Sequence, residues 1–445
     1  MKMQKALKEK IPVCRDRVKQ MLREGGSLKI SDISVRHLFS GIRGLDLLIG
    51  NVSYVDPYEG IHFRGHSVSD ILQILPKPKG CKSPYAGGMY YLLMTGDIPT
   101  LQDALEVEDE WKTRAEIPTY VVNMLQAMPK NTHPMTMLSQ AILALQADSK
   151  FDEGYNNGLQ KLDYWQATLE DSLNLTAKTP ALAAAIYNIK YRDRKLVSAD
   201  PNLDWSANFG HMIGKGWDQH YQELCRLFFG LHADQGTGNV SVHTACLVNS
   251  TLSDVYYSCS AAMNGLAGPL HGRANQDCLI WLLGILKKFG SLPTKEQLKD
   301  YVWETLNRGK IIPGYGHAVL RNTDPRFTAQ LKFGKAYMAD SKLFKLVEMV
   351  YEVVPHVLTK HGKAKSPWPN VDAISGTLQY QSGLKEFDFY TVLFGVGRML
   401  GITANLVWSR AIMLPLERPQ SITLDMVEQK IAELKVKKAF VVSEA

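Results

Sequence analysis

Apolar and polar positions follow helical spacing along most of the chain. In residues 294–309, the side chains that share one helix face are Leu298, Tyr301, Val302, Thr305 and Leu306. Thr294 and Gln297 have the spacing of a capping box before this face, and Gly309 follows it as a stop signal. A second such face follows Pro134, a residue type that favours the first turn of a helix. Each stretch therefore predicts an amphipathic helix.

Glycine and proline mark the predicted ends and turns of the other elements. In "GGMYYLLMTGDIPTLQ" one helix is expected to end at Gly96, and another to start near Thr100. The one convincing strand signal is "SYVDPYEGIHFRG", two short extended pieces around an Asp-Pro-Tyr-Glu-Gly turn. No internal repeat or Ser/Gly linker is visible. We expect an almost entirely α-helical fold with a small β-hairpin near residue 60.

Length and charge narrow the function classes. A chain of 445 residues can bury one large core or divide into two domains. The formal net charge of +7 is modest and suits small acidic molecules such as carboxylates or phosphates. Nucleic acid is not an expected partner, because the basic residues form no stripe interleaved with aromatics. No apolar run approaches about 18 residues, so we expect no membrane-spanning helix.

The cysteines indicate a reducing compartment. They are dispersed without CxxC or metal-site spacing: Cys14, Cys81, Cys225, Cys246, Cys259 and Cys278. Most lie in apolar helical surroundings, which predicts small buried side chains. The basic N-terminus lacks the apolar segment of a secretory signal, and Glu9 argues against a transit peptide. We therefore expect a cytoplasmic protein.

A first candidate for chemistry is His271 in "GLAGPLHGRANQ". It stands just before an apolar run that predicts a helix, and the positive end of a helix dipole disfavours an imidazolium. A neutral imidazole can donate its N–H to a developing oxyanion. The alternative is a helix-capping or core histidine whose hydrogen bonds are satisfied within the protein.

A second candidate is the stretch "PGYGHAVLRNTDPR". His317 is flanked by glycines, which let the backbone approach a ligand closely. Arg321 and Arg326 follow, and guanidinium groups bind carboxylates and phosphates through paired hydrogen bonds. The alternative places both arginines in surface ion pairs.

A third candidate is "KHGKAKSPWPNVDAISG". Lys363 and Lys365 form a cationic edge suited to phosphate, and Asp372 follows two prolines in a rigid loop that can aim a carboxylate. The alternative for Asp372 is a helix cap. Arg398 and Arg418 occur within otherwise apolar segments, where each guanidinium requires an anion from the protein or a ligand.

The sequence lacks the motifs that several classes of reaction require. The chain has no glycine-rich phosphate loop of standard spacing and no His pair with metal-binding spacing beside a Glu. Two histidines and one carboxylate remain, with arginines to hold a substrate and no Ser or Cys nucleophile. This combination favours proton abstraction and enol chemistry over acyl-enzyme hydrolysis.

The four motifs "AMNGLAGPLHGRANQ", "PGYGHAVLRNTDPR", "PWPNVDAISG" and "WSRAIMLPLERPQS" resemble, in this order, the citrate synthases, in particular their long form from mitochondria and some bacteria. The resemblance extends from "GIRGLDLLIG" to "LERPQS". It implies an all-α homodimer with shared active sites. Residues 1–272 and 384–445 would form a large domain, and residues 273–383 a small domain that closes over the substrates.

The resemblance also implies residue roles in the reaction that feeds acetyl groups into the tricarboxylic acid cycle. Asp372 would remove a methyl proton from acetyl-CoA, His271 would stabilise the enolate, and His317 would hydrogen-bond the ketone of oxaloacetate. Hydrolysis of citryl-CoA would then release citrate and CoA. Carboxylates of oxaloacetate would be held by Arg326, Arg398 and, across the dimer interface, Arg418; the implied CoA-binding residues are Arg43, Arg321, Lys363 and Lys365. The CoA thioester is a substrate, and no metal or cofactor is expected.

Two positions depart from the family pattern. Gln235 stands where a further oxaloacetate-binding histidine is expected, and Ile374 replaces a histidine near Asp372. A glutamine amide still donates a neutral hydrogen bond, and an apolar neighbour tends to raise the pKa of a carboxylate. Two alternatives therefore stay open: a 2-methylcitrate synthase that uses propionyl-CoA, and a non-catalytic binding protein with this fold. Because no transit peptide is evident, the expected location is the cytoplasm of a bacterium.

Overall fold

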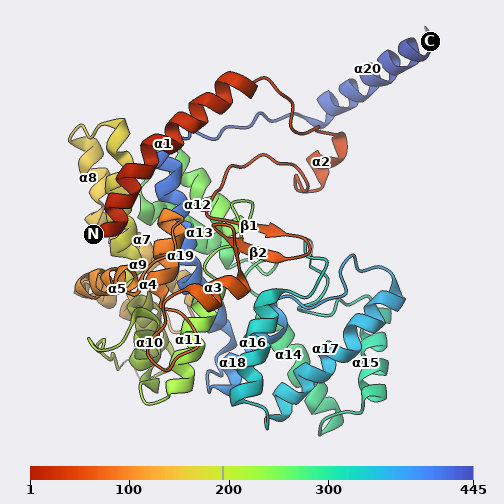
Figure 1. The fold of residues 1–445 in the computed structure, drawn as a ribbon. Helices are drawn as coiled ribbons and strands as arrows, with labels where there is room; N and C mark the ends of the chain where they lie inside the picture. Colours follow the sequence, from red (N-terminus) through yellow and green to blue (C-terminus); the bar gives the residue numbers. More distant parts are fainter. Residues whose placement is uncertain (193–194, 318, 444–445) are drawn as a thin grey trace.

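The computed structural model describes residues 1–192, 195–317 and 319–443, and helices form nearly all of its regular structure (Figure 1). In chain order they are α1 (Lys2–Gly25), α2 (Val35–Phe39), α3 (Val68–Ile74), α4 (Ala86–Thr95), α5 (Leu101–Arg114), α6 (Thr119–Ala127), α7 (Pro134–Ala144), α8 (Lys150–Asn156), α9 (Tyr164–Tyr191), α10 (Trp205–Gly210), α11 (Gln219–Leu231), α12 (Val240–Ser250), α13 (Val255–Leu266), α14 (Ala274–Phe289), α15 (Lys295–Asn307), α16 (Pro325–Tyr337), α17 (Lys342–His361), α18 (Asp372–Gln381), α19 (Tyr390–Ala411) and α20 (Leu424–Ser443). The prediction of an almost entirely helical fold is confirmed.

Local signals set several helix ends as the sequence predicts. Thr294 caps α15, because its hydroxyl accepts the backbone N–H of Gln297 while the Gln297 side chain accepts that of Thr294. Gly309 follows with a φ of +73°, the left-handed conformation that glycine favours. The helix at Pro134 begins at that residue, and α4 ends before Gly96, as predicted.

The predicted hairpin near residue 60 is present and gains a third strand. Strands β1 (Ser53–Asp56) and β2 (Gly60–Phe63) pair antiparallel, with Ser53 opposite Phe63. The Asp56 carboxylate accepts backbone N–H groups two and three residues later, which fixes the turn. The sequence did not predict β3 (His66–Ser67), which pairs with β2.

Helix α19 forms the centre of the larger group of helices. It packs against α4, α9, α11, α12 and α13, and nearly all of its residues are buried. The segment Phe387–Ala411 is long and apolar enough to cross a membrane by length and composition alone, but it is entirely buried inside this fold. Burial on every side accounts for its apolar composition.

Helices α14 to α18 form a second group whose members pack on one another (Figure 1). Of these, α16 also contacts α3 and α11 of the larger group. The boundaries expected for the two domains, at residues 272/273 and 383/384, stay a prediction.

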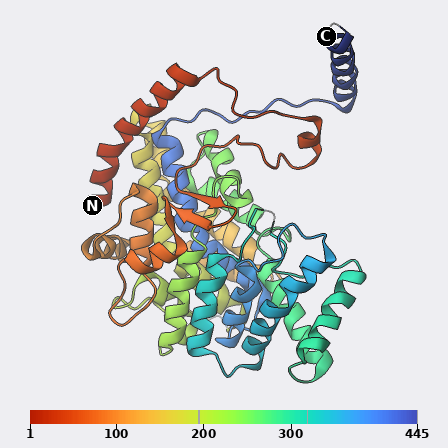
Figure 2. The same cartoon turned by 45° about the vertical axis from the view of Figure 1, so that its right-hand side comes forward.

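Two segments leave the body of the molecule. The segment that carries α2 and the one that carries α20 extend away from the helical body in both views (Figures 1 and 2). Both expose large apolar side chains, among them Leu28, Ile30, Phe39, Leu416 and Leu424. An extended segment with exposed apolar side chains lacks a core of its own to pack against.

Candidate active site

The loop that carries His317 is fixed to the loop that carries Asp372. Tyr315 and Pro369 form an isolated antiparallel bridge, and the Asn370 N–H donates to the Gly314 carbonyl at 2.9 Å. Gly314 has a φ of +79°, and a Cβ at this position would lie 2.7 Å from the Cα of Ala373. Glycine is therefore required where the two loops meet.

Asp324 positions Arg326 at the start of α16. The Asp324 carboxylate caps the helix by accepting the Arg326 N–H at 2.9 Å, and it forms a buried ion pair with the guanidinium at 2.7 Å. The same carboxylate accepts the N–H of Val371 at 3.3 Å, next to Asp372. One carboxylate thus ties the arginine to the start of α18.

Asp372 is the first residue of α18, so its prediction as a loop residue is wrong. The backbone N–H of Asp372 donates to the Asn370 side chain at 3.0 Å, which begins the helix directly after the prolines. Burial raises the pKa of Asp372 from 3.8 to about 6, against the opposing positive charges of Arg326 and Arg398. No side chain in the described ranges donates a hydrogen bond to its carboxylate. Such a carboxylate is a stronger base than an ordinary aspartate.

His317 is held as a neutral imidazole with a defined tautomer. Its Nδ1 faces the backbone N–H groups of Val319 and Leu320, each at 3.1 Å. Because both groups can only donate, Nδ1 accepts and the ring proton resides on Nε2. Burial, followed by the charge of Arg326, lowers the pKa of His317. Its Nε2–H is available as a neutral donor.

His271 lies three residues before α14, close to the predicted helix start. Its Nε2 is 3.1 Å from the Ser241 hydroxyl and 3.4 Å from the Ser241 backbone N–H, which donates to it. The ring packs edge-on against Phe394 at 5.9 Å. Burial, followed by the charge of Arg398, lowers the pKa of His271 to about 4. Burial, and not the helix dipole, is therefore the main reason why His271 is neutral.

Arg398 extends from the centre of α19 and is fully buried. Its Nε donates to the His232 carbonyl at 3.1 Å, and its Nη1 donates to the Asn239 side chain at 2.9 Å. The same Asn239 oxygen accepts the Ser241 hydroxyl at 2.8 Å, so a chain of contacts joins Arg398 to His271. Burial lowers the pKa of Arg398 to about 10.

Both buried arginines keep an unused donor. Within the described ranges, Nη1 of Arg326 and Nη2 of Arg398 are buried and have no hydrogen-bond partner. The charges of both act on Asp372, that of Arg326 acts on His317, and that of Arg398 acts on His271. Each charge therefore reaches its neighbours within the group Arg326, Arg398, Asp372, His317 and His271. Because a buried guanidinium N–H without an acceptor is costly, the site favours an anion.

Other predicted residues lie outside this group in the single chain. Arg43, Lys363, Lys365 and Arg418 are exposed. The residue before Arg418, Glu417, contacts His243 at 2.8 Å. These positions leave the predicted oxaloacetate contact of Arg418 and the CoA contacts untested.

Three further predicted residues contact other parts of the described structure: Arg321, Gln235 and Ile374. The Arg321 guanidinium donates to the carbonyls of Val319 and Leu320, which supports the His317 loop. The Gln235 side-chain oxygen accepts from Asn239 at 3.3 Å, so Gln235 is linked to Arg398 through one residue. Ile374 is fully buried among apolar side chains.

The sequence analysis missed two residues that shape the site. Asp324 was not identified, although Asp followed by Pro is the pattern of a helix cap before the first helical residue. Phe394 contacts both His271 and Arg398, with the guanidinium carbon 4.7 Å from its ring centre. No local signal distinguishes Phe394 from the other apolar residues of α19.

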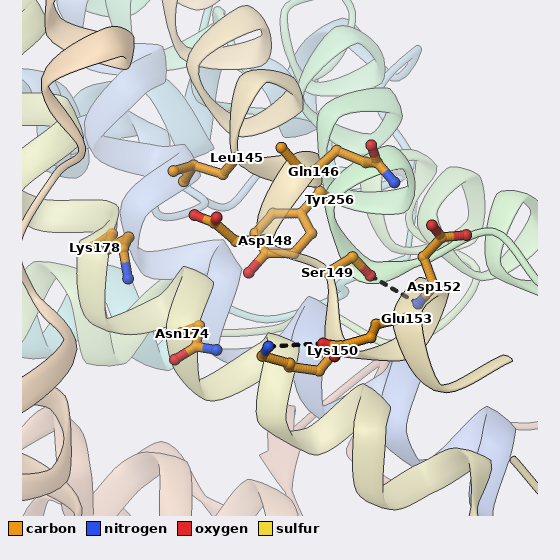
Figure 3. A pocket seen from close by; sticks show the side chains of 11 residues that line it. Leu145, Gln146, Asp148, Ser149, Lys150, Asp152, Glu153, Asn174, Lys178 and Tyr256 are labelled. Atoms are coloured by element: carbon orange, nitrogen blue, oxygen red, sulfur yellow. Dashed lines mark hydrogen bonds and ion pairs between the residues drawn. The ribbon is translucent and has the colours of Figure 1, made fainter. Parts of the chain in front are cut away.

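A polar cavity of about 500 Å³ lies elsewhere, beside α8, α9 and α13 (Figure 3). Asp148, Lys178 and Tyr256 face it, and Lys150 pairs with Glu153 at its edge. None of the predicted site residues lines this cavity.

Comparisons with known proteins agree with the geometry. The family model described as "Citrate synthase, C-terminal domain" matches residues 41–420. The chain is 47% identical over 426 residues to "Probable citrate synthase, mitochondrial" of Glossina morsitans morsitans, covering 96% of this chain and 91% of the relative. It is 48% identical over 420 residues to "Citrate synthase, mitochondrial" of Xiphias gladius, covering 94% and 89% respectively.

A solved structure has the same fold. The citrate synthase of Thermoplasma acidophilum, determined with carboxymethyl coenzyme A and oxaloacetate, aligns with a TM-score of 0.73 at 19% identity. The alignment covers 86% of this chain and 95% of that one. The predicted citrate synthase-like fold is therefore confirmed.

These findings decide between the open alternatives and correct the location. They support the predicted citrate synthase activity, an acyltransferase reaction, and do not favour a 2-methylcitrate synthase or a non-catalytic protein. The prediction of a bacterial cytoplasm is wrong, because the relatives are named as mitochondrial enzymes. The motif order, the convergent acid–base groups and the family match lead to one conclusion: this chain belongs to the citrate synthase family.

Proposed function

We propose that this site condenses acetyl-CoA with oxaloacetate and then hydrolyses citryl-CoA to citrate and CoA. The observation that carries the proposal is the pair of unused guanidinium donors on Arg326 and Arg398 beside Asp372, whose pKa is about 6. Oxaloacetate brings two carboxylates to such donors, and the thioester brings the proton for the base. The proposed location is the mitochondrion, as in the relatives.

Oxaloacetate binds first to the arginines in this proposal. The free N–H groups of Arg326 and Arg398 donate to its carboxylates, and the amide of Gln235 supplies a neutral donor nearby. His317 donates from Nε2 to the ketone oxygen, where negative charge develops as the new C–C bond forms. These donors are fixed by the protein before the substrate arrives, so little reorganisation accompanies the reaction.

Asp372 removes a methyl proton from acetyl-CoA. Its ionised form predominates at neutral pH, because the pKa of about 6 still lies below 7. The enolate oxygen then needs a donor that is not itself a strong acid, a role that neutral His271 can fill. The enolate carbon attacks the ketone carbon, the ketone oxygen takes the Nε2 proton of His317 to become the hydroxyl of citryl-CoA, and water then cleaves the thioester. The proposal needs no metal and no cofactor besides the CoA substrate.

Binding of CoA is proposed for Arg43, Arg321, Lys363 and Lys365. Lys363 and Lys365 are exposed on the segment between α17 and α18, where phosphate can reach them. Arg43 lies in the extended segment that carries α2. That position suits a contact with CoA bound to a second subunit.

We also propose that the active unit is a homodimer whose small domains, residues 273–383, close over the substrates. The extended segments expose apolar residues that a second copy could cover, and Arg418 lies on the segment before α20. Mixing inactive Asp372→Asn protein with inactive Arg418→Ala protein, then allowing subunits to exchange, provides a test. A mixed dimer contains one intact site if Arg418 acts across the interface, so about a quarter of wild-type activity should return. No recovery despite exchange would contradict the shared site.

The direct test of the proposed function is oxaloacetate-dependent release of CoA from acetyl-CoA. Arg398→Gln should weaken oxaloacetate binding roughly 10- to 150-fold, the range for hydrogen bonds to charged groups. Arg410→Gln is the matched control, because Arg410 is buried on the same helix and also keeps one unpartnered donor, its Nε, but donates to the Ser253 carbonyl and lies over Phe151, apart from the proposed site residues. Equal losses in both variants, or an inactive wild-type protein, would reject the proposal.

A further inference from the structure

The residue that follows His271 is held between two helices. Gly272 is buried, and its backbone N–H donates at 3.0 Å to the carbonyl of Leu266, the last residue of α13. A Cβ at Gly272 would lie 2.3 Å from that carbonyl oxygen and 2.6 Å from the methyl carbon of Thr391 on α19. The main chain beside His271 therefore fits closely between α13 and α19.

Thr391 supplies the hydrogen bonds at this contact. Its hydroxyl donates to the Gly272 carbonyl at 3.1 Å and accepts the side-chain N–H of Gln276 at 2.9 Å. All three residues are buried, and no other residue that the structure describes donates to the Gly272 carbonyl. The hydroxyl thus joins the turn that carries His271 to the first turn of α14.

The position of the His271 donor depends on this turn. The Ser241 backbone N–H donates to Nε2 of His271 at 3.4 Å, so the ring proton resides on Nδ1. Nδ1 is the ring nitrogen nearer to the main chain, and it moves with the backbone of residues 271 and 272. A displacement of about 1 Å at a reacting group can slow catalysis roughly 100-fold.

Thr391 and Phe394 support His271 from one face of α19, because residues three apart lie side by side on a helix. Phe394 packs edge-on against the imidazole at 5.9 Å, while Thr391 holds the residue that follows it. Gln276 lies on α14, in the second group of helices, so the Thr391 hydroxyl also joins the two groups. Contacts from one packed helix keep a side chain in a defined place.

We propose that Thr391 is a positioning residue for His271 in the condensation reaction. Through Gly272 and Gln276, its hydroxyl holds the turn so that the Nδ1–H of His271 points at the enolate oxygen of acetyl-CoA. This role rests on the proposed function of His271. Thr391 itself transfers no proton. Because the two buried arginines hold oxaloacetate, binding of that substrate does not depend on the Thr391 hydroxyl.

Steady-state kinetics, with calorimetric titration of the full chain by oxaloacetate, test this role. Thr391→Val keeps the shape of the side chain and removes the hydroxyl, so kcat/KM for acetyl-CoA should fall about 10- to 100-fold. The Kd for oxaloacetate should stay within about twofold of the wild-type value, because its donors are untouched. Thr391→Ser restores the hydroxyl, and its kcat/KM should stay within about threefold of wild type.

Thr403→Val is the matched control. Thr403 is also buried on α19, but its hydroxyl donates to the Met399 carbonyl within the helix at 2.8 Å. This variant should keep the wild-type kcat/KM, even where urea unfolding shows a loss of stability. A merely structural role of Thr391 would make the two valine variants alike: less stable and kinetically normal.

Gln276→Met keeps the proposal testable if Thr391→Val does not fold. It removes only the hydrogen bond on the α14 side, and kcat/KM for acetyl-CoA should fall about three- to tenfold. In an active enzyme, a wild-type kcat/KM in Thr391→Val or Gln276→Met would overturn the role of Thr391, as would Thr391→Ser as slow as Thr391→Val. A wild-type protein without oxaloacetate-dependent CoA release would instead reject the proposed function, and this role with it.

Discussion

Replacing Asp372 by asparagine should inactivate the enzyme and at the same time stabilise the fold. Asparagine has nearly the same size but carries no charge and no basic oxygen. If Asp372 is the base, turnover falls by roughly 10²- to 10⁴-fold. The charged carboxylate is also costly to keep in this site, because burial raises its pKa from 3.8 to about 6.

The pKa sets the magnitude of the stability gain. A folded-state pKa above the unfolded value means that the native protein binds the proton more tightly, so stability falls as pH rises from about 4 to 6. Above pH 6 the penalty is constant, and a rise from 3.8 to about 6 corresponds to about 3 kcal/mol. Attraction between a carboxylate and the start of α18 offsets roughly 0.3–1 kcal/mol of this. The variant should therefore be about 2–3 kcal/mol more stable at pH 7.5.

Urea unfolding at pH 7.5 and pH 5, together with oxaloacetate-dependent CoA release, provides the assay. The stability difference between variant and wild type should shrink at pH 5, where more of the native Asp372 is protonated. Asp340→Asn is the control, because Asp340 is exposed and should leave both readouts nearly unchanged. A variant less stable than wild type at pH 7.5, or one that keeps normal turnover, would refute this reasoning.

Three more predictions concern the same groups. Below about pH 6, kcat/KM should fall about tenfold per pH unit as Asp372 protonates, with no second loss from His271, whose pKa is about 4; a flat profile down to pH 5 would contradict the assignment. Gly314→Ala should lower the free energy of unfolding by more than about 2 kcal/mol and lower kcat, because the added Cβ would lie 2.7 Å from Ala373. Gly309 has a similar φ but no neighbour at the Cβ position, so Gly309→Ala should lower the free energy of unfolding by about 1 kcal/mol. Asp324→Asn should lower the free energy of unfolding by about 3–5 kcal/mol and raise the KM for oxaloacetate. Asp277→Asn breaks an exposed pair with Arg273 and should lower the free energy of unfolding by less than about 1 kcal/mol.

Local chemistry explains which parts of the fold were predictable. The capping box at Thr294 and the stop at Gly309 act within one or two turns, so sequence alone reveals them. Strand β3 has only two residues and exists because β2 lies beside it, which no local pattern encodes. Asp372 was predicted in a loop because prolines precede it, but the Asn370 side chain starts the helix at once.

The site shows the same division between local and distant causes. His271 was expected to be neutral from the helix dipole, and its pKa is lowered mainly by burial and then by Arg398, a residue 127 positions away in the sequence (398 minus 271). The tautomer of His317 depends on two backbone N–H groups whose direction only the folded loop defines. The need of Arg326 and Arg398 for an anion was predicted in part, since unpaired guanidinium groups in apolar segments are costly. Their unused donors are visible only in the structure.

A crystal structure with oxaloacetate and a non-reactive thioester analogue tests the central claim most directly. The account predicts that Nη1 of Arg326 and Nη2 of Arg398 each donate to an oxaloacetate carboxylate. It also predicts that Nε2 of His317 donates to the ketone, and that Asp372 faces the analogue's carbon α to the carbonyl. Oxaloacetate bound elsewhere, with those two arginine donors still unpaired, would contradict it.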